Sequence, residues 1–288
     1  MEREAVFEEH RRHLFAVAYR MLGTVADAED VVQDAFLRWR EARDEVASPR
    51  AYLTTVVTRL CIDQLKSARA QREEYFGTWL PEPVITEGPL SADAAAELAD
   101  SLSVAFLVLL ESLSPVERAA FLLREVFEYE YAEVGAILGK SEAACRQLVS
   151  RAREHVAARR PRYGASAERR AEITDRFMTA CETGDMQGLL DILAEDITLF
   201  SDGGGKARAA TRPVFGSDRV ARFIFGILKK APAGFGMRRT EINGEPGFVA
   251  SLDGRPIAAM TLHVVDDRIE GVYIVNNPDK LTAVAGEV

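Results

Sequence analysis

The chain has 288 residues, of which 48% are hydrophobic and 28% charged, and its formal net charge is −9. These values are ordinary for a globular protein and exclude disorder over most of the length, and at roughly 100–200 residues per domain they predict two domains or three small ones. The acidic total also argues against a protein that coats nucleic acid along its whole length.

Neither a membrane span nor a secretory signal is expected. The longest unbroken apolar run, Val104–Leu110, has seven residues, whereas a membrane span needs about twenty, and the first ten residues lack an apolar core. Cys61, Cys145 and Cys181 are odd in number and far apart, which is typical of neither a disulfide framework nor a metal cluster. We therefore expect a cytoplasmic protein that needs no cofactor.

Residues 6–71 have the apolar spacing of helices, and Asp27–Arg43 separates an apolar face from an acidic one. The acidic face carries Asp30, Gln33, Asp34 and Leu37. An exposed leucine among carboxylates offers an apolar anchor with a charged rim. This face is either an ordinary solvated surface or a docking surface for a basic partner.

The next helix is expected to begin at Pro49, with Ser48 as its N-cap. The side of this helix away from its apolar arc carries Thr55, Thr58, Arg59, Ile62, Lys66 and Arg69. Hydroxyl and cationic side chains suit a phosphate backbone, although a solvated face explains them equally well.

Residues 75–90 have no helical or strand period and contain three prolines and two glycines, so they are predicted to form a linker. Trp79 and Leu80 are large apolar residues in this linker, and a linker has no core of its own. They are expected to pack on a partner surface, and Pro81 and Pro83 reduce the entropy lost when they do so.

Residues 91–160 again have helical spacing. A helix opens at Ser114-Pro115, a second (Tyr131–Leu138) ends at Gly139, and Ser141 caps a third, which is the helix-turn-helix pattern. Between residues 140 and 163 the chain carries seven basic and two acidic residues. The third helix presents side chains that can reach base edges and phosphates in a major groove, namely Arg146, Gln147, Ser150 and Arg151.

The last third of the chain changes period. After Gly164 come two helices, and then apolar residues alternate over residues 197–200, 236–242, 248–252, 257–265 and 269–275, with one further helix at 218–230. Asn-Gly, Asp-Gly and Asp-Asp pairs between these runs are typical of hairpin turns. The predicted fold class is multidomain, with two all-α domains followed by an α+β domain.

Residues 1–163 resemble the extracytoplasmic-function group of bacterial sigma factors. The resemblance is carried by YRMLGTVADAEDVVQDAFLRW, SPRAYLTTVVTRLCIDQLKSARAQRE, LSPVERAAFLLREVF and YAEVGAILGKSEAACRQLVSRAR. It implies a region-two domain (1–74), a linker (75–91) and a region-four helix-turn-helix domain (92–163). It further implies that Asp30, Gln33, Asp34 and Leu37 dock on core RNA polymerase. Promoter DNA would be met at the −10 element by Thr55, Arg59, Lys66 and Arg69, and at the −35 element by Arg146, Gln147, Ser150 and Arg151.

Residues 164–288 resemble the SnoaL-like domain, an α+β cone with a curved mixed sheet that one subgroup of these sigma factors carries. The resemblance rests on WLPEP in the linker, DGGGK at Asp202–Lys206 and NPDKL at Asn277–Leu281. It implies regulation in cis by this domain, with no obligatory separate anti-sigma protein. We expect the three motifs to meet and to fix how the DNA-binding domains are oriented, through Trp79, Leu80, Pro81, Asp202, Gly203, Gly204, Gly205, Lys206, Asn277, Pro278, Asp279, Lys280 and Leu281.

Two alternatives stay open. A cone-shaped domain can enclose a pocket, so the tail could sense a small molecule or, less favourably, act as a cyclase or isomerase through Asp196, Asp202, His263 or Asn276. The chain could also be a promoter-binding regulator that never joins polymerase. The acidic docking face and the second DNA-facing helix argue against that alternative. His10 and His13 are three residues apart, with no third metal ligand near them in the sequence.

Overall fold

The computed structural model describes residues 2–42, 46–73, 75–86, 102–157 and 165–285, without the side chains of residues 2, 68–73, 157 and 285. The chain divides into two units. The first contains residues 1–74 and 107–160, and the second contains residues 75–106 and 161–288. The described part of the predicted linker, residues 75–86, therefore belongs with the C-terminal domain. Residues 87–91 of the predicted linker lie outside the described residues.

The first unit begins with three helices that pack on one another, α1 (Glu2–Leu22), α2 (Val25–Glu41) and α3 (Pro49–Glu73). Thr24 is the N-cap of α2 and accepts a hydrogen bond from the backbone N–H of Asp27. The buried side of α2 consists of Ala28, Val31, Val32, Ala35 and Trp39, which is the predicted apolar arc apart from the half-buried Phe36.

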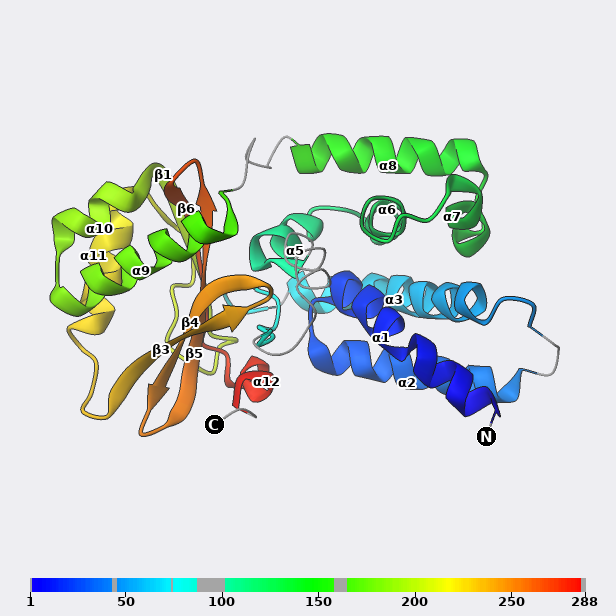
Figure 1. Ribbon diagram of the computed structural model, residues 1–288, viewed down its shortest axis with the longest axis horizontal. Helices are drawn as coiled ribbons and strands as arrows, with labels where there is room; N and C mark the ends of the chain where they lie inside the picture. The colour runs from blue at the N-terminus through cyan, green and yellow to red at the C-terminus, as the bar shows by residue number, and fades with distance from the viewer. Residues whose placement is uncertain (1, 43–45, 74, 87–101, 158–164, 286–288) are drawn as a thin grey trace. The chain divides into compact units, whose positions relative to one another are not determined.

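The second set of helices contains the predicted helix-turn-helix (Figure 1). Ser114 and Glu117 form a capping box at the start of α6, and Gly139 ends α7 with a left-handed φ of 65°, a conformation that glycine adopts without strain. The elements are α5 (Val104–Leu110), α6 (Pro115–Phe121), the π-helical turn η1 (Leu122–Val126), α7 (Tyr131–Leu138) and α8 (Glu142–Ala157).

The C-terminal domain of the second unit is built on one mixed sheet of six strands in the order β2-β1-β6-β5-β4-β3. The strands β1 and β6 pair in parallel, and the other pairs are antiparallel. The strands are β1 (Leu193–Asp202), β2 (Val214–Phe215), β3 (Phe235–Ile242), β4 (Glu245–Leu252), β5 (Arg255–Val265) and β6 (Arg268–Val275).

Three helices, α9 (Ala167–Thr183), α10 (Met186–Ile192) and α11 (Ser217–Leu228), share one apolar core with the sheet and lie together on one side of it in Figure 1. The chain ends with the 3₁₀ turn η2 (Pro278–Lys280) and α12 (Thr282–Ala285). The predicted multidomain fold class, two helical domains followed by an α+β domain with a mixed sheet, is confirmed. Neither β2 nor the two C-terminal turns were predicted from the sequence.

The hairpin turns follow the predicted dipeptides. Both residues of Asn243-Gly244 (φ 54° and 74°), Asp253-Gly254 (51° and 79°) and Asp266-Asp267 (44° and 68°) have positive φ. Two successive positive φ values are what a type I′ turn requires. These three turns fix the register of the antiparallel strands β3 to β6.

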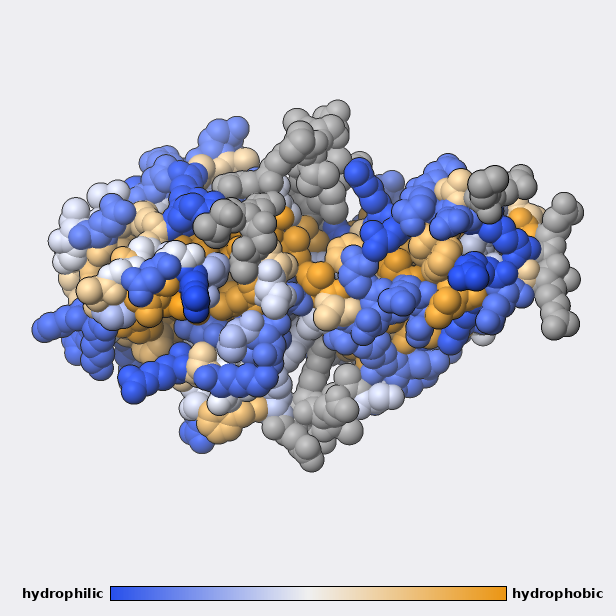
Figure 2. Space-filling model, turned by 90° about the horizontal axis from the view of Figure 1, so that it is seen from below, coloured by the Kyte–Doolittle hydropathy of each residue, from blue (hydrophilic) through white to orange (hydrophobic). Residues whose placement is uncertain are grey.

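Hydrophilic side chains cover much of the surface visible in Figure 2, with hydrophobic ones interspersed. Among the residues that the structure describes, no helix is both long enough and apolar enough to cross a bilayer.

Candidate functional site

The acidic face of α2 is exposed. Asp30, Gln33 and Asp34 lie on the side of the helix away from its buried residues, and Leu37 is 45% exposed. As expected from the sequence, this face presents an apolar side chain beside carboxylates to solvent.

The polar face of α3 is only partly open. Arg59 and Lys66 are exposed, and Thr55 is half-buried and donates to the carbonyl oxygen of Ala51 at 2.7 Å. Lys66 pairs with the exposed Asp63 at 3.2 Å, so a carboxylate lies beside this cation. The side chain of Arg69 lies outside the described part of the structure.

Two residues assigned to that face are buried instead. Thr58 is fully buried and Ile62 is 8% exposed. The helix was read as packing on one side only, but α3 also contacts α6 and α7. Arg59 donates from Nε to the carbonyl oxygen of Ile137 at 3.2 Å, so the last turn of α7 occupies part of the face predicted to meet DNA.

A polar cluster joins these two sets of helices within the first unit. The hydroxyl of Tyr129 lies 2.9 Å from His13 Nε2 and 3.1 Å from Thr54 Oγ1. Burial, followed by the positive field of Arg50, lowers the pKa of His13 to about 4. Arg118, 3% exposed, donates to the carbonyl oxygen of Met21 at 2.6 Å. His13 thus has a packing partner 116 residues away in the sequence, which no local pattern indicated.

The four candidate residues of α8 are all exposed, on the side opposite its buried apolar residues. Arg146 lies over the ring of Tyr131 at 4.3 Å and pairs with Glu142 at 3.0 Å. Arg151 pairs with Glu117 at 3.3 Å. Within the described residues, the side chains of Gln147 and Ser150 make no hydrogen bond.

The second unit contains a buried site around Asp202. Its carboxylate is fully buried and accepts hydrogen bonds from the Tyr75 hydroxyl (2.6 Å), the Leu80 backbone N–H (2.9 Å), the Gly204 backbone N–H (3.0 Å) and Lys280 Nζ (2.8 Å). Burial, followed by the hydrogen bond to Asp202, raises the pKa of Tyr75 above its usual range. Buried charges need partners, and the four donors supply them to the Asp202 carboxylate. Two of these donors belong to the linker, which is thereby held at this site.

Lys280 completes this site from the C-terminal motif. Its Nζ also donates to the Leu80 carbonyl oxygen at 2.6 Å and lies 4.3 Å from the centre of the Trp79 ring. Leu80 is fully buried, and Asn277 Nδ2 donates to the Tyr75 hydroxyl at 3.1 Å. The structure thus brings the WLPEP, DGGGK and NPDKL segments together, and we call this group of contacts the linker clamp.

The glycines of DGGGK permit this approach. Gly204 has a φ of 57°, and a Cβ there would lie 2.4 Å from Asn277 Nδ2. Lys206 and Asp279 form an exposed ion pair at the edge of the clamp. The other predicted members fall into two groups: Pro81, Gly203 and Leu281 are buried, and Gly205 and Pro278 are exposed.

Sequence reasoning missed the continuation of the linker along the sheet. Ile85 forms an antiparallel bridge with Ile242 on the edge strand β3. Thr86 donates from its backbone N–H to the Glu241 carbonyl oxygen at 3.0 Å, and the buried Asn243 accepts from the Val84 N–H through Oδ1 at 2.9 Å. Residues 84–86 therefore extend the sheet at its β3 edge. The run of three β-branched residues, Val84-Ile85-Thr86, is the local signal of this, and it is very short.

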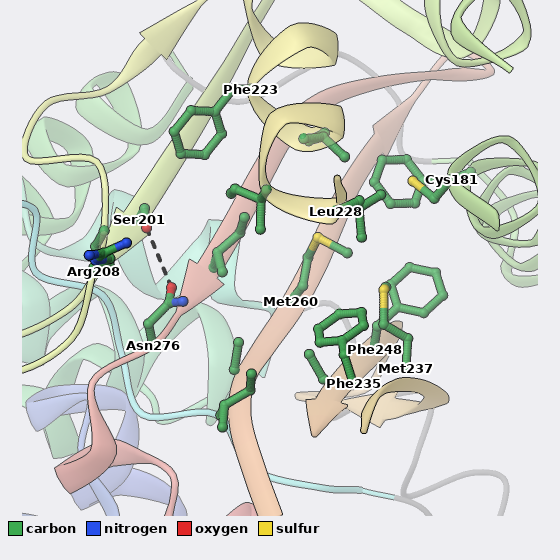
Figure 3. Close-up of a pocket in the computed structure, with 18 residues that line it drawn as sticks. Cys181, Ser201, Arg208, Phe223, Leu228, Phe235, Met237, Phe248, Met260 and Asn276 are labelled. Atoms are coloured by element: carbon green, nitrogen blue, oxygen red, sulfur yellow. Dashed lines mark hydrogen bonds between the residues drawn. The ribbon is translucent and has the colours of Figure 1, made fainter. Parts of the chain in front are cut away.

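The C-terminal domain also encloses a cavity, drawn in Figure 3, of about 130 Å³. Of the four polar candidates for chemistry there, only Asn276 lines it, whereas Asp196, Asp202 and His263 do not. Within the described part of the chain, no group of three or more histidine, cysteine, aspartate or glutamate side chains could hold a metal ion.

Comparison with known proteins matches two segments to sigma factor families. Residues 6–71 match sigma-70 region 2 and residues 103–156 match sigma-70 region 4. The ECF RNA polymerase sigma factor SigJ of Mycobacterium tuberculosis is 44% identical, over 96% of this chain and 92% of SigJ. The probable ECF RNA polymerase sigma factor SigI of the same organism is 29% identical, over 99% of this chain and 96% of SigI.

A solved structure agrees with the sequence matches. The crystal structure of Mycobacterium tuberculosis SigJ superposes with a TM-score of 0.79 at 41% identity, covering 96% of this chain and 97% of that one. The similarity therefore includes the C-terminal α+β domain as well as both helical regions. The chain belongs to the extracytoplasmic-function RNA polymerase sigma factors.

Proposed function

We propose that this sigma factor binds core RNA polymerase through Asp30, Gln33, Asp34 and Leu37 and directs it to promoter DNA. Thr55, Arg59, Lys66 and Arg69 meet the −10 element, and Arg146, Gln147, Ser150 and Arg151 meet the −35 element. The supporting observation is that an exposed acidic face on α2 and an exposed polar face on α8 occur in one chain. The functional domains are 1–74, 92–163 and 164–288, joined by the linker 75–91.

The docking face separates this function from that of a regulator that binds promoters without polymerase. Such a regulator has no use for a leucine exposed among carboxylates, whereas a surface that docks on a larger partner does. The proposed protein acts in the cytoplasm, and polymerase, rather than the sigma factor, carries out RNA synthesis.

The C-terminal domain regulates this activity in cis. The linker connects the two promoter-reading domains, and the clamp holds it through the buried Asp202 and Lys280. Any change that loosens or tightens the clamp therefore changes how freely the two promoter-reading domains move relative to each other. No separate anti-sigma protein is obligatory for such a device, and a small molecule bound in the C-terminal domain is a suitable signal.

Binding to core polymerase is the first test. Full-length protein is expected to co-purify with core polymerase, and Asp34→Arg is expected to weaken this binding at least tenfold by placing a cation in the acidic face. Glu182→Arg makes the same charge change on the exposed surface of α9 and should bind like the wild type. Failure of the wild-type chain to bind core polymerase would contradict the proposed function.

Promoter activity tests the regulation. Transcription in vitro with core polymerase is expected to change when Trp79→Ala removes the ring over Lys280, but not with Phe76→Ala, which alters a linker side chain that is 66% exposed. Unchanged transcription with Trp79→Ala, at matched thermal stability, would remove the regulatory part of the proposal. Without polymerase, promoter affinity should be low and should fall steeply with salt.

A further inference from the structure

The cavity of the C-terminal domain has an apolar wall. It measures about 130 Å³, and most of the side chains that line it come from α9, α11 and strands β3 to β6, with others from β1 and the loop after it. Figure 3 shows Phe223, Leu228, Met260, Phe248 and Met237 around one common space. The lining residues Ile227 and Ile257 are 47% and 39% exposed, so the cavity has a mouth to solvent.

One end of the cavity is polar. Ser201 at the end of β1 and Asn276 just after β6 lie together there, with Ser201 Oγ 3.4 Å from Asn276 Oδ1, and Arg208 lies on the same side in Figure 3. Within the described part of the chain, Arg208 forms neither a hydrogen bond nor an ion pair. Arg208 is exposed, and its permanently charged guanidinium, beside a hydroxyl and an amide, has N–H donors that are open to an acceptor on a bound ligand.

The lining suits binding better than chemistry. No aspartate, glutamate or histidine is among the described residues that line the cavity, so no side chain of the usual acid–base kind reaches its interior. Cys181 lines the wall, but burial raises the pKa of its thiol to about 12. The thiol therefore stays protonated and is a poor nucleophile.

Size and polarity together define the ligand. The volume of about 130 Å³ is close to that of an apolar cavity of about 150 Å³ that holds benzene. A guanidinium prefers a planar carboxylate, which it binds through two parallel hydrogen bonds. We propose that the cavity binds a monocyclic carboxylate, its ring among the phenylalanine and methionine side chains and its carboxylate at Arg208, Ser201 and Asn276.

The same strand ends carry the linker clamp. Ser201 and Asn276 line the cavity, whereas the next residues, Asp202 and Asn277, contact Tyr75, because successive side chains of an extended chain point to opposite faces. The backbone N–H groups of Asn276 and Asn277 both donate to the Asp202 carbonyl oxygen, at 2.7 and 2.9 Å. A carboxylate drawn to Asn276 therefore acts on the backbone that holds the linker. This coupling deepens the proposed regulation in cis and rests on it, whereas binding itself does not.

Calorimetry with three probes tests the site on the full-length protein. Benzoate has both the ring and the carboxylate and is expected to bind with a Kd of about 1 mM or lower. Toluene, which has only the ring, should bind more weakly, and acetate, which has only the carboxylate, should not bind. Arg208→Gln is expected to weaken benzoate binding about tenfold, as the loss of a charged hydrogen bond does, and to leave toluene binding unchanged.

The matched control is Arg212→Gln, which removes the same charge from an exposed residue of the same loop that does not line the cavity. It should bind benzoate like the wild type. If both variants weaken benzoate binding equally, the effect of Arg208 comes only from the net charge of the protein, and the assignment of the carboxylate to Arg208 is overturned. Failure of both benzoate and toluene to bind would overturn the site.

Fluorine NMR tests the coupling to the clamp. The chain has two tryptophans, Trp39 and Trp79, so 5-fluorotryptophan gives two resonances, which a Trp39→Phe variant assigns. Saturating benzoate is expected to shift the Trp79 resonance, and the shift should be lost in Arg208→Gln at the same benzoate concentration. Benzoate that binds by calorimetry without moving this resonance would overturn the coupling. Neither experiment contains polymerase, so failure here is distinct from failure of the sigma function.

Discussion

At the level of single residues, Asp202 carries the most consequence. Its fully buried carboxylate is met by four donors from three separate segments of the chain. A buried ion pair contributes little net stability when compared with a well-packed apolar pair, but removal of one partner leaves a charge that is neither solvated nor paired. The clamp is therefore sensitive to any change that affects only one of its two charges.

The first prediction follows from that asymmetry. Asp202→Asn keeps the shape of the side chain but leaves Lys280, whose side chain is 8% exposed, without its counter-charge. The free energy of unfolding of the C-terminal domain should fall by about 3–5 kcal/mol, measured by urea denaturation of the full-length protein. The control is Asp279→Asn, which breaks the exposed pair with Lys206 and should cost less than about 1 kcal/mol. Equal costs for the two variants would contradict the role of burial.

The second prediction concerns His13. Its folded-state pKa of about 4 lies below the ordinary value of 6.5, so between these values the unfolded chain is protonated at this residue and the folded chain is not. The contribution of neutral His13 is complete above pH 6.5 and is lost as the pH falls toward 4, by about 3 kcal/mol in total. Urea denaturation at several pH values should show this slope.

Carboxylates titrate in the same pH range as His13, so the slope of the wild type alone does not isolate the His13 contribution. A comparison of the wild type with a variant that lacks this imidazole does. His13→Phe should have a flatter dependence of unfolding free energy on pH between 4 and 6.5 than the wild type. His155→Phe, a replacement on the exposed surface of α8, should keep the wild-type slope. Parallel curves for the wild type and His13→Phe would show that this imidazole does not report on folding.

At the level of elements, the linker behaves as a short added strand. It pairs with the edge strand β3 at Ile85 and is fixed on either side by Asn243 and Glu241. Extended segments that add to a sheet edge gain main-chain hydrogen bonds whatever their sequence. Main-chain bonds alone do not fix the register of the linker against the sheet. That register is set at the other end of the linker, where the buried Leu80 contacts the buried Lys280.

The third prediction tests this strand. Asn243→Gly keeps the positive φ of the turn but removes the Oδ1 that accepts from Val84 and the Nδ2 that donates to the Leu102 carbonyl oxygen. Amide hydrogen exchange in residues 80–86 should become about tenfold faster. Asp253→Gly makes the equivalent replacement in the next hairpin turn and should leave exchange in the linker unchanged. Equal protection in the two variants would mean that Asn243 does not hold the linker.

The sequence predicted most elements because their periods are long and their caps explicit. The dipeptides Asn243-Gly244 and Asp253-Gly254 located two hairpins, and Gly139 located the end of α7. The strand β2, with only two residues, is too short to show a period. Thr58 and Ile62 were placed on an outer face because the pattern of one helix cannot reveal a second helix packed against it.

The clamp was predictable only in part. Motifs pointed to Trp79, Asp202 and Lys280, but neither to Tyr75 nor to Asn243, which holds the continuation of the linker along the sheet. Tyr75 meets Asp202 over 127 residues, and Asn243 meets Val84 over 159. Such contacts are set by how the sheet and linker pack, and local propensity carries no information about them.

At the level of the whole molecule, the proposed function requires the two promoter-reading domains to separate. The −10 and −35 elements are about 25 base pairs apart, or about 85 Å along the duplex. Within the first unit, however, α3 contacts α6 and α7, and Arg59 bonds to Ile137. With the proposed assignments, this arrangement cannot make the −10 and −35 contacts at the same time.

The fourth prediction measures this opening. Fluorophores on Glu8→Cys and Glu154→Cys, both exposed, should move apart by tens of ångströms when core polymerase and promoter DNA are added, and energy transfer should fall. Cys61, Cys145 and Cys181 are buried and burial raises their pKa, so they should resist labelling. Identical transfer in the free protein and in the transcribing complex would contradict the separation.

The clamp can form only late in the synthesis of the chain. Leu80 and its partner Lys280 are 200 residues apart, and at about 5–20 residues per second the ribosome needs about 10 to 40 s to pass from one to the other. Both helical regions are complete once α8 has been translated, at residue 157, which is before the strand ends that hold the linker are made. We therefore expect a nascent chain, like the product of a message truncated before residue 202, to have both helical regions without the clamp on the linker.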